Sequence, residues 1–242
     1  MAGLPAISEK IQASYKDMRG EHDRYRSWEH CYRYFRETSP SGLSADRRHA
    51  ALQLGFYLAS WGMYRGSSFL LQYTYTVHLG VIDQLCAPEY AGLWEREVGA
   101  SGRDLELVKT IMNAARAIRE AYRPFAPKSE ARQASDILVT KILLGTIGCL
   151  PACDRYFIRG FKEAGLKFSY LNSLFVERVL HFCLEHSSEL REQQVLIEKA
   201  GGLRYPLMKL VDMYFWQIGY EMDLKRPPPI ARGEARCAVI SI

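Results

Sequence analysis

The residue types best suited to chemistry gather in one stretch of the chain, residues 140–157. An apolar segment that contains Lys141 leads through two glycines to Pro151, and Asp154 follows at the expected start of another helix. The helix dipole stabilises an aspartate at a helix start by about 0.3 to 1 kcal/mol, so Asp154 can act simply as a cap. The same carboxylate, with Lys141 nearby, could instead accept a proton or stabilise a developing positive charge.

The order of these features resembles a segment of the helix-hairpin-helix DNA glycosylases. In that family an apolar helix, a short glycine-containing link and the pattern Pro-x-x-Asp-x-x-(apolar) place the catalytic Asp at the opening of a helix. Pro151, Asp154 and Phe157 match this pattern. The resemblance implies an all-α, glycosylase-like fold in which Asp154 is the catalytic carboxylate. An anion suits hydrolysis of an N-glycosidic bond because the sugar develops oxocarbenium character as the bond breaks.

The resemblance also implies which kind of glycosylase this would be. Bifunctional members carry a Schiff-base lysine at the start of the helix after the hairpin, and Lys141 lies too close to Asp154 to take that place. We therefore expect a monofunctional enzyme in which Lys141 is a second active-site residue that contacts a phosphate or pairs with Asp154. The implied partner is duplex DNA with an extruded modified or damaged base, in repair or in anti-phage defence, and no cofactor is implied.

Two aromatic clusters could wall a pocket for such a base. Residues 59–72 place two glycines around a Tyr-Arg pair before a helix start, which favours an anion site or, alternatively, a tight corner between core helices. Residues 212–220 are dense in aromatic side chains, a pattern more typical of a core than of a pocket. The candidate substrate-binding residues from these clusters and from the turn after Asp154 are Trp61, Tyr64, Arg65, Ser67, Gln72, Tyr156 and Trp216.

Basic residues beside Asp154 are candidates for contacts with the DNA backbone. Arg155, Arg159 and Lys162 follow the i, i+4, i+7 spacing of one helix face. An exposed charged face explains the same residues without a ligand. The alternative hypothesis is therefore a non-catalytic helical protein that binds nucleic acid or another protein, with Asp154 acting only as a cap.

Metal chemistry is not expected from this sequence. His181, Cys183 and His186 are close in sequence, but their spacing does not bring three ligands to one face of a helix.

The elements that must position these residues are expected to be helices throughout, because nearly every long segment has the helical hydrophobic period. A boundary is expected at 123–128, which divides a helical part at 1–122 from a second helical part at 123–224, followed by an extended Pro-rich arm at 225–242. The predicted helices cover 7–37 with a break near residue 20, 47–63, 68–84, 105–122, 129–147 capped by Ser129, 151–165, 172–186, 190–200 and 203–224.

Composition sets the broad class. The chain has 242 residues, of which 48% are hydrophobic, and a net charge of +5, which excludes a disordered tail or a fibre and permits a polyanionic partner. Its first residues lack the basic and apolar regions of a secretory signal, and its most apolar segment, 137–150, is shorter than the roughly 20 residues of a membrane span. Six scattered cysteines without a CxxC pair favour reduced thiols. We therefore predict a cytoplasmic protein without a membrane span.

Overall fold

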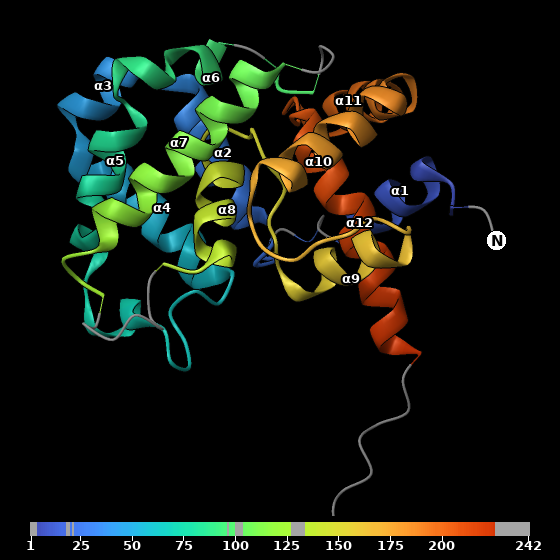
Figure 1. Cartoon of the computed structure of the whole chain (residues 1–242), viewed down its shortest axis with the longest axis horizontal. Helices are drawn as coiled ribbons and strands as arrows, with labels where there is room; N and C mark the ends of the chain where they lie inside the picture. Colours follow the sequence, from blue (N-terminus) through green and yellow to red (C-terminus); the bar gives the residue numbers. More distant parts are fainter. Residues whose placement is uncertain are drawn as a thin grey trace, which may run out of the picture.

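The computed structural model describes residues 4–17, 20, 22–95, 97–99, 104–126 and 134–225, and every regular element within them is helical, as the hydrophobic period predicts (Figure 1). None of the helices in these ranges is long and apolar enough to span a membrane. The α-helices are α1 (Ile7–Asp17), α2 (Arg26–Glu37), α3 (Pro40–Ala45), α4 (Arg47–Ser60), α5 (Leu79–Leu85), α6 (Ala91–Glu95), α7 (Leu105–Tyr122), α8 (Asp136–Gly145), α9 (Arg155–Glu163), α10 (Ser173–Glu185), α11 (Ser187–Gly201) and α12 (Leu207–Leu224), with 3₁₀ turns η1 (Phe69–Gln72), η2 (Tyr75–His78) and η3 (Pro88–Tyr90).

The helices form two groups in space. Figure 1 shows α2 to α8 on one side, and α1 together with α9 to α12 on the other. The first helix of the chain therefore packs on the last ones, α11 and α12, whereas α8 packs on α2, α4 and α7. This grouping crosses the predicted boundary at 123–128 in both directions. The division into parts at 1–122 and 123–224 stays a prediction, and the Pro-rich arm lies outside the described residues apart from residue 225.

Several predicted helix starts are displaced by side-chain caps. Helix α8 begins at Asp136, where the Ser135 hydroxyl accepts a hydrogen bond from the Leu138 amide, whereas the predicted cap Ser129 lies outside the described residues. Helix α9 begins after Asp154, not at Pro151. In both cases an oxygen-bearing side chain satisfies amides that the first helical turn leaves unpaired. The last helix starts at 207, after Pro206 and without a side-chain cap, and not at 203.

The predicted helix at 68–84 is interrupted, and the one at 7–37 has the break that was predicted near residue 20. The first is replaced by η1, η2 and the short α5, because Ser68 and Thr74 accept bonds from the amides two residues ahead and Tyr73 is extended. These local hydroxyl bonds compete with a continuous helix, and the β-leaning residues in between do not favour one. The second ends at residue 17, and α2 begins at 26. The short helices α3 and α6 were not predicted.

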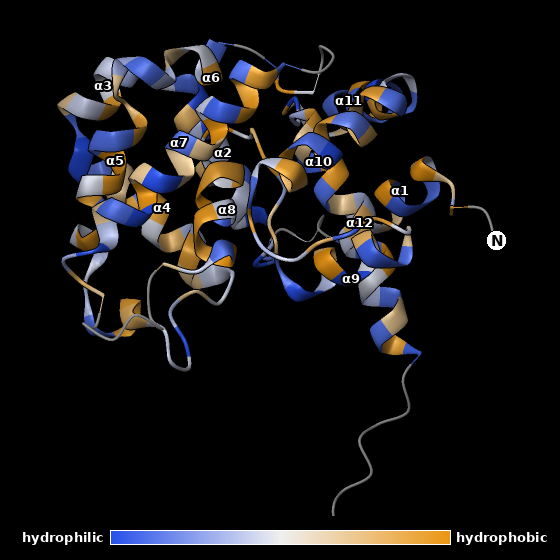
Figure 2. Ribbon diagram, in the orientation of Figure 1, coloured by the Kyte–Doolittle hydropathy of each residue, from blue (hydrophilic) through white to orange (hydrophobic). Residues whose placement is uncertain are grey.

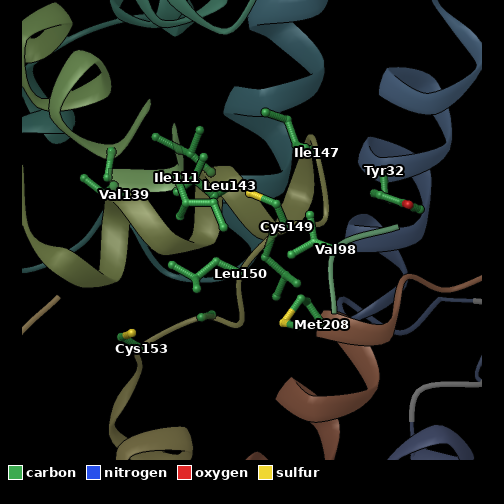
Figure 3. Packing of buried hydrophobic residues seen from close by; sticks show 14 of the residues in the cluster. Tyr32, Val98, Ile111, Val139, Leu143, Ile147, Cys149, Leu150, Cys153 and Met208 are labelled. Atoms are coloured by element: carbon green, nitrogen blue, oxygen red, sulfur yellow. The ribbon is translucent and has the colours of Figure 1, made fainter. Parts of the chain in front are cut away.

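The core reaches continuously from one group of helices to the other. Figure 3 shows side chains from α7, α8, the link after α8 and α12 packed together, among them Ile111, Leu143, Leu150 and Met208. Helix α8 is the most apolar part of this core (Figure 2), and every residue of it from Leu138 to Gly145 is buried. This buried stretch includes Lys141, so a basic side chain lies inside the core.

The cysteines fit the prediction of reduced thiols within the described residues. They are free, and four of them are fully buried: Cys31, Cys149, Cys153 and Cys183. Burial raises the pKa of the Cys149 and Cys183 thiols to about 12, so these thiols stay protonated and unreactive at neutral pH.

A pair of glycines sets how closely α9 lies on α12. A Cβ on Gly160 would collide with the carbonyl oxygen of Phe215, and a Cβ on Gly219 would collide with the carbonyl oxygen of Tyr156. Only glycine allows the two backbones to approach this closely. The contact holds the start of α9, and therefore Asp154, at a fixed place beside α12.

Candidate active site

Asp154 uses its two carboxylate oxygens for different contacts. Oδ1 accepts hydrogen bonds from the backbone amides of Tyr156 at 3.0 Å and Phe157 at 3.1 Å, which caps α9. Oδ2 lies 3.6 Å from the Nζ atom of Lys141. The side chain of Asp154 is 16% exposed, whereas that of Lys141 is only 3% exposed. The predicted cap is therefore present together with the contact to Lys141, which is one of the two roles predicted for that lysine, and the cap does not use Oδ2.

A second buried ion pair lies nearby on the first turns of α12. The Nζ atom of Lys209 is 2.8 Å from Oδ2 of Asp212, and both side chains are less than 5% exposed. Oδ1 of Asp212 accepts a hydrogen bond at 3.0 Å from the amide of Ala152, two residues before Asp154. The link between α8 and α9 is thus tied to α12 at the point where the Asp154 carboxylate begins the next helix.

Trp61 connects the two pairs. The centroid of its ring is 4.5 Å from the Nζ atom of Lys141 and 5.3 Å from that of Lys209, distances suited to cation–π attraction. Tyr25 and Tyr57 pack against the same ring edge to face. The indole Nε1 of Trp61 is buried and has no hydrogen-bond acceptor among the described residues.

Burial shifts the charge states within this cluster. It lowers the pKa of the Lys141 ammonium, although Asp154 and Asp212 act in the opposite direction. It also raises the pKa of Asp212, although Lys209 opposes that shift. Both shifts favour the neutral forms because an uncompensated charge is costly away from water. Shifted titrations of this kind are typical of functional sites and also occur in structural ion-pair networks.

Two cavities adjoin this cluster and share four aromatic walls: Tyr25, Trp61, Trp216 and Tyr220. The first, which we call the Asp154 cavity, has a volume of about 560 Å³ and also contains Lys141 and Asp154. The second, the Asp212 cavity, has a volume of about 360 Å³ and also contains Lys209 and Asp212. Three exposed arginines border the Asp154 cavity, namely Arg24, Arg65 and Arg155.

The structure brings together part of the predicted site. Seven of the predicted residues line the Asp154 cavity: Lys141, Asp154, Trp61, Arg65, Arg155, Tyr156 and Trp216. Their contact with a substrate stays a prediction. No match was found for this chain among protein families, curated proteins or solved structures.

The other predicted residues do not line either cavity. The hydroxyl of Tyr64 is hydrogen-bonded to Nε2 of the buried His78 at 2.7 Å, which turns it towards the core. Ser67 and Gln72 are exposed on the loop and turn beyond. Arg159 is held 2.8 Å from Asp223, and Lys162 is exposed on α9 outside the cavity walls. The three predicted backbone-binding residues therefore have different surroundings, although they share one helix.

Sequence reasoning missed the second ion pair and two of the shared walls, Tyr25 and Tyr220. A signal for the pair existed, since Lys209 and Asp212 stand three residues apart in an otherwise apolar helix start. Charged residues at such positions are rarely buried unless they are paired. No comparable signal marked Tyr25, because its place against Trp61 depends on how α2 packs on α4.

Proposed function

We propose that this chain is a monofunctional DNA glycosylase that hydrolyses the N-glycosidic bond of a modified or damaged base, with Asp154 as its catalytic carboxylate. The observation that carries the proposal is the second oxygen of Asp154. It is not used by the helix cap, and it belongs to a carboxylate on the wall of a cavity with aromatic sides and a basic border.

The surroundings of Asp154 suit the chemistry. The two amide bonds to Oδ1 fix the carboxylate in place, and a fixed anion stabilises an oxocarbenium-like sugar better than a mobile one. An ionised Oδ2 can also orient or deprotonate the attacking water. Because the Lys141 side chain is only 3% exposed, we assign it the role of positioning Oδ2 of Asp154.

The cavity walls suit the rest of the substrate. An extruded base can stack on aromatic rings, and Trp61, Tyr156 and Trp216 supply such rings beside Asp154. Arg24, Arg65 and Arg155 can neutralise phosphates at the border, which predicts binding that weakens as salt rises.

The experiment that tests this function pairs base release with a matched cap variant. Duplexes that carry candidate modified bases are incubated with the protein and then treated with alkali, so that each released base becomes a strand break. We expect Asp154→Asn to abolish the breaks while it keeps the cap of α9, because asparagine caps helices as well as aspartate does. Asp46→Asn is the control, since Asp46 caps α4 and lines neither cavity. Breaks that persist in Asp154→Asn would rule out the catalytic assignment.

A non-catalytic nucleic-acid-binding role is the second candidate. It is favoured by the cap bonds of Asp154 and by the ion pairs of Arg155 and Arg159 with Asp223, all of which the fold explains without a reaction. This candidate predicts salt-dependent DNA binding that Asp154→Asn leaves unchanged, with no base released from any duplex.

A further inference from the structure

Three consecutive backbone amides in the link between α8 and α9 have hydrogen-bond acceptors, and the last of them belongs to Asp154. The Ala152 amide donates to Oδ1 of Asp212 at 3.0 Å, and the Cys153 amide donates to the Thr140 hydroxyl at 2.9 Å. The Asp154 amide donates to the carbonyl oxygen of Ala152 at 2.9 Å. Ala152 and Cys153 are buried, so water does not compete for these bonds. A stretch without regular secondary structure is therefore fixed by side chains from α8 and α12.

The Thr140 hydroxyl is the acceptor on α8. It donates its own proton to the carbonyl oxygen of Asp136 at 2.6 Å, which leaves its lone pairs for the Cys153 amide. Thr140 is fully buried and precedes Lys141, whose ammonium lies 3.6 Å from Oδ2 of Asp154. Helix α8 therefore contacts the backbone of the link through Thr140 and the carboxylate that follows it through Lys141.

The Asp212 carboxylate is the acceptor on α12. Its Oδ2 is paired with Lys209 at 2.8 Å, and its Oδ1 accepts from the Ala152 amide. Lys209 opposes the rise that burial causes in the pKa of Asp212, which favours the charged carboxylate, and a charged acceptor bonds more strongly to an amide. A buried ion pair often stabilises a protein no more than apolar side chains of the same volume do. An apolar side chain at position 212, however, could not accept from the Ala152 amide.

We propose that Thr140 and Asp212 are positioning residues for the reaction at Asp154. This inference rests on the glycosylase function proposed above, because it requires Asp154 to act on the substrate. Neither residue lines the Asp154 cavity, so each acts through the backbone of the link, which determines where the Asp154 carboxylate lies on the cavity wall. A displacement of about 1 Å at a catalytic group can lower a rate by about 100-fold.

Substitutions of Thr140 test this role through the rate of base release. Thr140→Val removes the hydroxyl at nearly the same volume, and Thr140→Ser keeps it. On a duplex from which the wild type releases a base, we expect Thr140→Val to lower kcat by about 10- to 100-fold with little change in KM, and Thr140→Ser to restore most of the rate. Thr146→Val is the matched control, because Thr146 is equally buried at the end of α8 and donates to the carbonyl oxygen of Ile142 in that helix. Equal losses in Thr140→Val and Thr146→Val would contradict the assignment.

Two double variants test Asp212 in the same assay. Lys209→Met/Asp212→Leu removes the ions and leaves the Ala152 amide without an acceptor, whereas Lys209→Gln/Asp212→Asn removes the ions but keeps an amide oxygen that can accept. We expect the apolar double variant to lower kcat by about 10- to 100-fold and the amide double variant to retain most of the rate. Because Asp212 also lines the adjoining cavity, a rise in KM at unchanged kcat would mean that Asp212 binds the substrate itself, which would overturn its positioning role. Equal losses of kcat in both double variants would overturn it as well.

Amide hydrogen exchange, followed by NMR, tests the link without any reaction. We expect the Cys153 amide to exchange about tenfold faster or more in Thr140→Val than in the wild type, and to be unchanged in Thr146→Val. Unchanged exchange in Thr140→Val would contradict the hydrogen bond on which the proposal depends.

Failure of this inference can be told apart from failure of the proposed function. Faster exchange of the Cys153 amide in Thr140→Val, without base release from any duplex by the wild type, would retain the contact that fixes the link and remove the glycosylase. Base release that Asp154→Asn abolishes, but that Thr140→Val and the apolar double variant leave at the wild-type rate, would retain the enzyme and overturn the positioning role.

Discussion

The two buried Lys–Asp pairs of this protein are built in different ways. Lys209 and Asp212 belong to one helix turn, lie 2.8 Å apart and are almost completely buried. Lys141 and Asp154 come from α8 and from the cap of α9, lie 3.6 Å apart, and the aspartate is partly exposed. The first pair is fixed by local helix geometry. The second depends on how α8 and α9 are placed, and the link between them is bonded to α12. Asp154 is the carboxylate better placed to act on a substrate, because it is partly exposed and its Oδ2 has only the longer contact with Lys141.

The largest expected effect comes from removing the lysine of each pair in turn. Lys209→Met leaves the Asp212 carboxylate buried with only the Ala152 amide, and we expect it to lower the free energy of unfolding by about 3 to 5 kcal/mol. Lys141→Met leaves Asp154 with two cap bonds and contact with solvent, so we expect a smaller loss, about 1 to 3 kcal/mol. Urea unfolding followed by circular dichroism gives both values. A larger loss in Lys141→Met would reverse the distinction drawn between the pairs.

The second largest effect is expected from loosening the packing of α9 on α12, the helices that carry Asp154 and Asp212. Gly160→Ala forces the two backbones apart, and we expect a loss of about 1 to 3 kcal/mol in the free energy of unfolding. Because this contact places Asp154, the proposed base release should fall as well, even where the variant remains folded.

Gly92→Ala is the control for that substitution. Gly92 lies in α6, and an added Cβ there would meet nothing within 4 Å. Alanine at such a site should leave stability unchanged or raise it by up to about 1 kcal/mol. Equal losses in the two variants would show that glycine matters at position 160 for a reason other than close packing.

His78 differs from both pairs, because it is a buried titratable group that has no ionic partner among the described residues. His78 is fully buried between the hydroxyls of Tyr64 and Tyr122, and burial lowers its pKa to about 3. The unfolded chain takes up a proton near pH 6.5, and the folded chain does so only near pH 3. His78 therefore contributes stability that is present above about pH 6.5 and is lost as the pH falls towards 3.

The size of this effect can be measured directly. We expect His78 to account for a loss of about 2 kcal/mol between pH 8 and pH 5, because between pH 6.5 and pH 5 only the unfolded chain holds the proton, at about 1.4 kcal/mol per pH unit. His78→Asn should be less stable than the wild type at pH 8 but should lose less on acidification. Urea unfolding at the two pH values tests this, and an unchanged pH slope in the variant would exclude His78 as the titrating group.

The sequence was sufficient to predict the fold class and part of the site. Periodic apolar positions predicted the long helices, and the Pro-x-x-Asp pattern located Asp154 at a helix start. Two features were out of reach. The helix starts at 136 and 155 depend on which side-chain oxygen accepts a bond from the amides of the first turn. Several residues that could cap a helix lie near each start in the sequence. The Asp212 cavity depends on the contact between α1 and α12, the first and last helices of the sequence. No local sequence pattern predicts a contact between segments so far apart in the chain.

The smallest effect is expected at an exposed ion pair, which completes the comparison with the buried ones. Arg47 and Asp83 join α4 to α5 at 2.8 Å, a distance equal to that of Lys209 and Asp212, but their side chains are 51% and 46% exposed. Water and salt screen this pair, so we expect Arg47→Gln to cost less than about 1 kcal/mol and to cost still less in high salt. Urea unfolding at low and high ionic strength measures both. A loss as large as that of Lys209→Met would mean that the separation of the charges, and not their burial, determines what these pairs contribute.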